Sequence, residues 1–292
     1  MIYPAPSKTL RKSNVGKYNW KVINYSCGVK YPQEGAGFMS KIRERAKPYL
    51  YEAGDKLAIL VHGFTGTPDD MRELAKYLAA KGISAKAIRL AGHGTTDWQD
   101  LEQSSYYDWW KTLEDEVREA ANKYRKIYLI GYSFGANLSF DIAARYPDLI
   151  EGVVSLGISV YLRKEWFVRL ALPIFHNFLK RIRKRYIKKE HLAEYLNSGS
   201  QVFVSTKSIY DFYHFIDRYT KKELGKVTVP ALIIHSRDDS VTHPSSSEFV
   251  HARISSPQKE LIILDDINHN PIRSQRKNII YTKIEGFIQH NF

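Results

Sequence analysis

Short apolar runs along the chain alternate with segments in which apolar residues recur every three or four positions. The runs have the length and composition of buried strands, and the periodic segments have the spacing of helices packed on one face. Strands are predicted at residues 57–62, 84–90, 127–130, 152–156, 229–235 and 260–264. Helices are predicted at residues 68–81, 106–123, 136–145, 244–254 and 273–289. This order predicts an α/β fold with a mostly parallel sheet flanked by helices.

The alternation stops between residues 158 and 226, where aromatic and basic helical segments replace the strand pattern. We interpret 158–226 as a helical insertion between two consecutive strands of one core, which would comprise residues 1–157 and 227–292. Pro173 is expected to divide the first helical segment of the insertion into two helices. Residues 1–50 form an irregular N-terminal extension whose pattern is compatible with leading antiparallel strands.

The composition is typical of a folded globular protein with a large apolar core, and it argues against several other classes of protein. The 292 residues are 43% hydrophobic and 13% aromatic, which is enough apolar material for one large α/β domain with an insertion. The apolar runs are too short to cross a bilayer, and the first residues lack the apolar segment of a secretory leader. The single cysteine, Cys27, predicts neither an internal disulfide nor a metal cluster. We therefore expect a cytoplasmic protein.

The formal net charge of +13 is concentrated in the insertion. Residues 161–190 contain ten Lys or Arg residues against Glu165 and Glu190. Three interpretations of this basic block are open. It can form a solvated face over an apolar lining, it can contact an anionic membrane surface, or it can bind nucleic acid. No nucleic-acid motif accompanies the charge, so we expect no nucleic-acid partner.

The strongest chemical signal is Gly131-Tyr132-Ser133-Phe134-Gly135, between the 127–130 strand and the 136–145 helix. A serine flanked two residues away by glycines at such a junction is typical of a nucleophile on a sharp, strained turn. A serine hydroxyl needs a base, and the base needs a carboxylate that orients it. Ser133 is the candidate nucleophile, and in this architecture its partners are expected later in the chain, each just after a strand.

Candidates for both partners, and for an oxyanion site, stand at the expected positions. The acid follows strand 229–235, where Asp239 is preferred over Asp238, and the base is His269, after the last strand. The backbone N–H groups of Phe64 and Phe134 are the candidate oxyanion donors. His62 is expected to brace the oxyanion loop and His93 to be structural, while His235 and His243 have no assigned role.

These motifs together resemble an α/β-hydrolase, most closely the bacterial carboxylesterase and monoacylglycerol-lipase-like branch. They are His-Gly-Phe-Thr-Gly at 62–66, Gly-His-Gly at 92–94, Gly-Tyr-Ser-Phe-Gly, Arg-Asp-Asp-Ser-Val at 237–241 and Asn268-His269. The resemblance covers residues 55–290 and implies the triad Ser133, Asp239 and His269. It further implies a cap or lid inserted after the sixth strand, and neither cofactor nor metal.

The expected activity is hydrolysis of carboxylic esters of short to medium acyl chain, including monoacylglycerols, through an acyl-enzyme. Lysophospholipase, thioesterase, acyltransferase and carbon–carbon bond hydrolase activities use the same triad and stay open as alternatives. A non-catalytic hydrolase-like binding protein is the alternative from another class. The expected partner is a small-molecule or lipid-derived ester.

Overall fold

The structure is a computed structural model that describes residues 21–23, 40–175, 181–183, 193, 197–265, 267 and 269–290. Its centre is an eight-stranded sheet with the order β1-β2-β4-β3-β5-β6-β9-β10. The strands are β1 (Lys21–Ile23), β2 (Tyr49–Glu52), β3 (Lys56–Val61), β4 (Ser84–Ile88), β5 (Lys126–Tyr132), β6 (Gly152–Leu156), β9 (Ala231–Ser236) and β10 (Lys259–Leu264). Strands β4, β3, β5, β6, β9 and β10 are parallel to their neighbours in this run, whereas β1 pairs antiparallel with β2 and β2 with β4.

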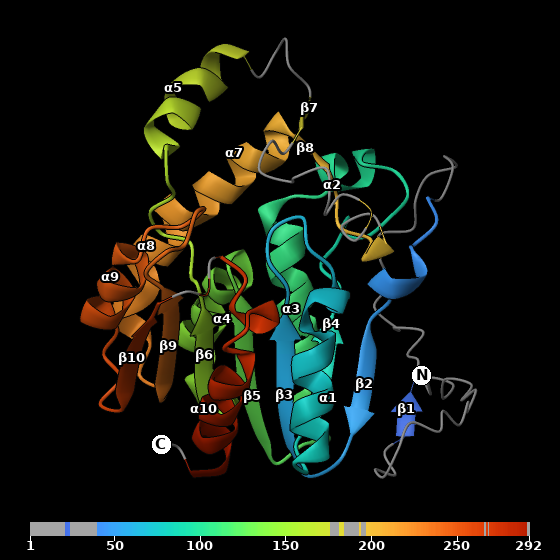
Figure 1. Cartoon of the computed structure of the whole chain (residues 1–292), viewed down its shortest axis with the longest axis vertical. Coiled ribbons are helices and arrows are strands. Elements are labelled where there is room, and N and C mark those ends of the chain that lie inside the picture. The colour runs from blue at the N-terminus through green and yellow to red at the C-terminus, as the bar shows by residue number, and fades with distance from the viewer. Residues whose placement is uncertain are drawn as a thin grey trace, which may run out of the picture.

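Helices cover both faces of the sheet, and each face has its own apolar core (Figure 1). On one face lie α1 (Arg72–Ala80), which follows the 3₁₀ turn η2 (Pro68–Met71), and α10 (Lys277–His290), which follows η7 (Pro271–Arg273). On the other face lie α3 (Tyr106–Ala121), α4 (Phe134–Arg145) and α9 (Ser245–Arg253). The short elements α2 (Gln99–Gln103), η1 (Glu44–Ala46) and η3 (Pro147–Leu149) connect these layers. The predicted mostly parallel α/β sandwich is confirmed.

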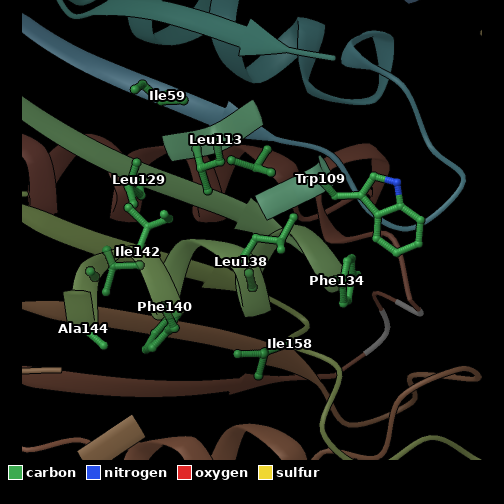
Figure 2. Packing of buried hydrophobic residues seen from close by; sticks show 14 of the residues in the cluster. Ile59, Trp109, Leu113, Leu129, Phe134, Leu138, Phe140, Ile142, Ala144 and Ile158 are labelled. Atoms are coloured by element: carbon green, nitrogen blue, oxygen red, sulfur yellow. The ribbon is translucent and has the colours of Figure 1, made fainter. Parts of the chain in front are cut away.

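The core beneath α4 is built from large apolar side chains of α3, α4 and the strands. Trp109 and Leu113 of α3 and Leu138 and Phe140 of α4 are all buried in it (Figure 2). The rings of Trp109 and Phe134 meet edge to face, with centroids 5.7 Å apart. Because Phe134 directly follows Ser133, this packing fixes the backbone next to the candidate nucleophile.

The 158–226 segment forms its own group of elements between β6 and β9. These are α5 (Glu165–Phe175), β7 (Arg181–Arg183), β8 (Phe203–Ser205), α7 (Thr206–Phe215), the π-helical turn η5 (Ile216–Thr220), α8 (Lys221–Glu223) and η6 (Leu224–Lys226). Strands β7 and β8 pair with each other and stand apart from the main sheet. Figure 1 shows α5 and α7 beyond the carboxyl ends of the parallel strands, the end of the sheet at which Ser133 lies.

One local expectation about this segment is tested only in part. Pro173 was expected to separate two helices; α5 includes Pro173 and ends two residues later, at Phe175, and residues 176–180 lie outside the described residues. A proline inside a helix removes the hydrogen bond to the carbonyl four residues earlier. The end of α5 so soon after Pro173 is in keeping with that loss.

Candidate active site

Ser133 occupies a strained turn between β5 and α4. Its backbone angles are φ 52° and ψ −122°, a conformation that non-glycine residues rarely adopt. Helix α4 begins at the next residue, so the Ser133 side chain lies at the positive end of a buried helix. The side chain is 8% exposed. The chain has therefore placed a nucleophilic hydroxyl at a site that favours developing negative charge.

The two flanking glycines have a steric explanation. A Cβ on Gly131 would lie 2.3 Å from Ala136 Cα, and a Cβ on Gly135 would lie 2.3 Å from the carbonyl oxygen of Val61. Backbone occupies both positions, so no rotamer change of a neighbour could make room. The glycines of the motif are thus required by the close approach of α4 to β5 and β3.

The His62–Gly66 loop approaches Ser133 from β3. A Cβ on Gly63 would lie 3.1 Å from Ser133 Cβ, which places this loop against the nucleophile. Thr65 has a positive φ of 63°, so the loop is strained as well. Among the described residues, neither the Phe64 nor the Phe134 amide donates a hydrogen bond. Both N–H groups are available to an oxygen bound beside Ser133.

His62 braces this loop, as expected. Its Nδ1 lies 2.9 Å from the Gly63 carbonyl oxygen, and its Nε2 accepts a hydrogen bond from Leu90 N at 3.2 Å. Because Nε2 accepts, the proton of the neutral ring is on Nδ1. Complete burial lowers the pKa of His62 to about 4, so the ring is neutral at physiological pH. His93 packs beside it with ring centroids 5.0 Å apart.

Asp239 and His269 form a close pair. His269 Nδ1 lies 2.9 and 2.8 Å from the two carboxylate oxygens of Asp239. Asp239 is 1% exposed, whereas the competing candidate Asp238 is exposed. The acid loop after β9 therefore turns Asp239 toward His269 and Asp238 toward solvent.

Hydrogen bonds around Asp239 favour its ionised form. Burial alone would raise its pKa, but bonds from His235, His269 and Thr242 outweigh burial and hold the pKa well below its ordinary value. The amides of Val241 and Thr242 also donate to the carboxylate, at 2.7 and 2.8 Å. An ionised Asp239 can orient the His269 ring with Nδ1 protonated, which leaves Nε2 to accept a proton.

His235, which had no role at the sequence level, lies beneath this pair. It is fully buried, and its Nε2 is 3.4 Å from Asp239 Oδ2 while its Nδ1 is 2.6 Å from Ser247 Oγ. His243, in contrast, lies outside the pair and bonds Ser245.

Three loops bring Ser133, the candidate nucleophile, and the Asp239–His269 pair to the same end of the sheet. The amide of Ser133 donates to the Leu156 carbonyl at 2.9 Å, which ties the Ser133 turn to the end of β6. The next residue, Gly157, has φ +69°, and a Cβ there would lie 3.6 Å from Asp239 Oδ2 and 3.9 Å from the His269 carbonyl oxygen. The rings of Tyr132 and His269 are 5.5 Å apart. Ser133, Asp239 and His269 thus belong to one site.

No sequence motif marks Ser159, whose side chain contacts the candidate nucleophile directly. Ser133 Oγ lies 3.1 Å from Ser159 Oγ, and both side chains are buried. Asn137, one turn into α4, bonds both the carbonyl and the amide of Ser159, at 2.9 and 3.3 Å. Ser159 follows β6 without a recognisable motif, so only the three-dimensional arrangement identifies it.

The 158–226 segment contacts the loops of the site at two places along its length. At its start, Arg163 N donates to Val241 O at 2.8 Å and His243 N donates to Tyr161 O at 2.8 Å, beside the acid loop. Near its middle, Gln201 N donates to Thr65 O at 3.1 Å, and Thr67 Oγ1 donates to Ser198 O at 2.7 Å. Farther along, the ring of Phe212 of α7 packs in a tilted arrangement against the rings of both Phe64 and Phe134, with centroids 5.0 Å apart in each case.

No group of three or more His, Cys, Asp or Glu side chains among the described residues is arranged to hold a metal ion. No helix in the described part of the chain combines the length and apolar character that crossing a membrane requires.

A family of hydrolases described as serine aminopeptidase, S33, matches residues 53–275. The chain belongs to this family. The α/β-hydrolase resemblance of the sequence is thereby confirmed, and the matched range includes all of Ser133, Asp239 and His269. Because the family is defined by fold and sequence, its members need not share one substrate.

Relatives of the chain within the α/β-hydrolases include lipases and esterases. It is 28% identical over 249 residues to a thermostable monoacylglycerol lipase of Bacillus sp. (strain H-257), covering 84% of this chain and 95% of that protein. It is 21% identical over 245 residues to a carboxylesterase of Bacillus subtilis (strain 168), covering 83% and 96%.

Solved structures agree on the fold. A structure from a study of the metagenome-derived lipolytic enzymes LipS and LipT matches with a TM-score of 0.75 at 23% identity, over 85% of this chain and 99% of that one. A soluble variant of monoglyceride lipase from Saccharomyces cerevisiae matches with a TM-score of 0.70 at 18% identity, over 88% and 97%.

Proposed function

We propose that the protein is a serine esterase that hydrolyses carboxylic esters, including monoacylglycerols, through an acyl-enzyme on Ser133. The observation that carries the proposal is the bond between buried Asp239 and His269 Nδ1, at 2.8 Å, beside the strained Ser133 turn. The names of the relatives, a monoacylglycerol lipase and a carboxylesterase, support an ester hydrolase. A cytoplasmic location belongs to the same proposal and rests on the sequence alone.

Acylation begins when His269 Nε2 takes the proton of the Ser133 hydroxyl. Ser133 Oγ forms a bond to the ester carbonyl carbon, and the carbonyl π electrons move to oxygen, which the Phe64 and Phe134 amides stabilise. The C–O bond to the alcohol then breaks, and the His269 imidazolium protonates the departing alkoxide. The product is an acyl ester on Ser133 and a free alcohol.

Deacylation repeats these steps with water. His269 Nε2 removes a proton from water, and the hydroxide forms a bond to the acyl carbon. The tetrahedral species collapses with loss of Ser133 Oγ, which regains a proton from His269 as the carboxylic acid departs. Asp239 stays ionised throughout and stabilises the imidazolium of each step, in keeping with its lowered pKa.

A chain-length series of nitrophenyl esters and monoacylglycerols tests this proposal on wild-type protein and Ser133→Ala. We expect turnover of short and medium chains by the wild type and a loss on the order of 10⁵-fold or more in kcat for the variant. Equal turnover by the two proteins would contradict the proposal. Preference for a thioester or lysophospholipid over every ester would instead reassign the substrate of the same triad.

We further propose that the 158–226 segment is a cap whose outer surface contacts anionic membranes. Six of the eight large apolar side chains exposed among the described residues lie on this segment, and three of them are on α5: Trp166, Phe167 and Leu170, at 70%, 59% and 64% exposure. A pocket of about 360 Å³ between α5 and α7 is lined by tyrosines, by Arg218 and Lys222, and by Arg169 paired with Asp217. Apolar side chains beside cations are suited to a lipid interface.

Co-sedimentation with vesicles tests the membrane contact independently of catalysis. We expect binding to vesicles containing an anionic phospholipid and weaker binding to neutral vesicles, with loss of both in a Trp166→Ser/Phe167→Ser variant. Ile279→Ser is the matched control because Ile279 is also exposed, at 51%, but lies on α10. Negligible binding of wild-type protein to both vesicle types would contradict the contact and leave the esterase proposal standing.

A further inference from the structure

Ser159 makes a side-chain contact with Ser133, the proposed nucleophile, that the proposed mechanism does not use. Its Oγ is 3.1 Å from Ser133 Oγ, and Ser159 is 1% exposed. A hydroxyl in this position touches the oxygen that attacks the substrate and later leaves the acyl-enzyme. Each of the two serine side chains has one hydroxyl proton, and this limits which of them can donate to the other.

The position of Ser159 is determined by its backbone. The Asn137 amide group bonds the Ser159 carbonyl and N–H, and Asn137 Nδ2 also lies 3.1 Å from Thr220 Oγ1 in the π-helical turn. Asn137 is fully buried and lies four residues after Ser133 on α4. The same helix therefore carries the nucleophile and clamps the residue that contacts it.

The direction of the hydrogen bond follows from the chemistry. Each hydroxyl has one proton to donate, and in the proposed mechanism Ser133 donates its proton to His269 Nε2. Ser133 Oγ can then only accept from Ser159, so Ser159 must be the donor during attack. As negative charge develops on Ser133 Oγ, this bond becomes charge-assisted and stronger in a site with little water.

Burial alone does not account for the contact. Ser155 on β6 is also fully buried, yet its Oγ has no hydrogen-bond partner among the described residues. Two buried serines four positions apart thus differ in whether they reach a partner. Ser155 is the natural control for Ser159.

We propose that Ser159 is a positioning residue for the nucleophile, whose hydroxyl donates a hydrogen bond to Ser133 Oγ and stabilises it while it is deprotonated. This inference rests on the proposed esterase function. The hydrogen bond from Ser159 stabilises Ser133 Oγ during attack on the ester and during its departure from the acyl-enzyme. Removing this bond should therefore lower kcat and leave substrate binding unchanged.

The test compares Ser159→Ala, Ser159→Thr and Ser155→Ala by steady-state kinetics and by the rate of phosphonylation with a fluorophosphonate, per titrated active site. We expect Ser159→Ala to lower kcat and the phosphonylation rate about tenfold, with KM within twofold of wild type. Ser159→Thr, which keeps the hydroxyl, should recover most of the rate. Ser155→Ala should match wild type, and the pH at which activity is half-maximal should be unchanged in all three.

Wild-type rates in Ser159→Ala would overturn the proposal, as would equal losses in Ser159→Ala and Ser159→Thr or a change confined to KM. If Ser159→Ala folds poorly, Ser159→Cys replaces it, because a thiol is a weak hydrogen-bond donor. A reduced rate in Ser159→Cys together with a near wild-type rate in Ser159→Thr would support the proposal. Equal rates in these two variants would overturn it. Ser133→Ala separates the two hypotheses. If it stays active, the esterase proposal fails; if only Ser159→Ala stays fully active, this inference alone fails.

Discussion

Arg163 donates a hydrogen bond from Nε to the main-chain oxygen of Asp239, at 2.5 Å. Arg163 belongs to the start of the proposed cap, and Asp239 is the proposed acid of the triad. Farther along the same segment, Gln201 N donates to Thr65 O, and Ser198 O accepts from Thr67 Oγ1. The proposed cap therefore contacts two loops that hold proposed catalytic groups, so we expect a change at either contact to alter activity.

Removing the Arg163 side chain should lower activity without removing any member of the triad. We expect Arg163→Ala to reduce kcat/KM by about threefold to tenfold, the value of one hydrogen bond to a buried backbone oxygen. Lys164→Ala is the control, because Lys164 is the adjacent basic residue and is exposed. Equal kinetics for the two variants would show that the Arg163 bond does not support the acid loop.

Asp239 and Asp238 are adjacent but should differ sharply in importance. Asp239→Asn replaces the acceptor of the His269 Nδ1 proton with an amide that can donate, which favours the wrong tautomer of the ring. We expect a loss in kcat on the order of 10⁴-fold. Asp238→Asn, at an exposed position, should stay within twofold of wild type. Steady-state ester hydrolysis by both variants measures this difference in kcat. A larger loss in Asp238→Asn than in Asp239→Asn would indicate that Asp238 is the acid of the triad.

His62 should make the folded state less stable in mild acid. Burial lowers its pKa from 6.5 to about 4. Between these values the unfolded chain binds a proton that the folded protein does not, so stability falls as pH drops from about 6.5 to about 4. The lowered pKa of His62 accounts for a loss of about 3 kcal/mol in the free energy of unfolding once the pH has fallen below both values.

Urea unfolding at pH 7 and pH 4.5 measures this loss in wild-type protein and in His62→Gln, which cannot be protonated. The variant should lose less stability than the wild type between the two pH values, although its stability at pH 7 will be lower because it loses the bonds to Gly63 and Leu90. Parallel profiles would show that His62 is not the group responsible.

Gly135 should tolerate no side chain. A Cβ there would meet the Val61 carbonyl oxygen at 2.3 Å, so α4 or β3 must move. We expect Gly135→Ala to lower the free energy of unfolding by about 1–3 kcal/mol and to impair activity, since Val61 precedes the oxyanion loop. Gly286→Ala in α10 is the control: a Cβ there meets nothing within 4 Å, and alanine should be neutral or stabilising. Thermal unfolding of both variants checks the contrast, and equal midpoints would contradict it.

The core of the fold could be predicted from the sequence because its local and long-range signals agree. The 152–156 run, for example, is an entirely buried strand, β6, with the predicted bounds. The helix predicted at 68–81 begins instead with a 3₁₀ turn, because Thr67 and Asp70 form a capping box that tightens the first turn before α1. Helix α4 starts at Phe134 rather than Ala136, since the Ser133 turn leads directly into it.

The residues of the candidate site that belong to sequence motifs could be predicted. The residues that only tertiary contacts bring to the site could not. Ser133 and His269 lie at strand ends that periodicity identifies, so their proximity could be inferred from topology. Ser159, Asn137 and Arg163 are placed at the site by hydrogen bonds across the fold, and no spacing in the sequence encodes those bonds. The same holds for His235, whose closeness to Asp239 depends on how the acid loop turns back over β9.

If Ser133 is the nucleophile and His269 and Asp239 activate it, a fluorophosphonate should react with Ser133, and peptide mass spectrometry will locate the adduct. We expect one adduct per chain, located on Ser133, with esterase activity lost in proportion to labelling and no adduct in Ser133→Ala. An adduct on another residue, or full labelling of Ser133 with activity retained, would contradict it.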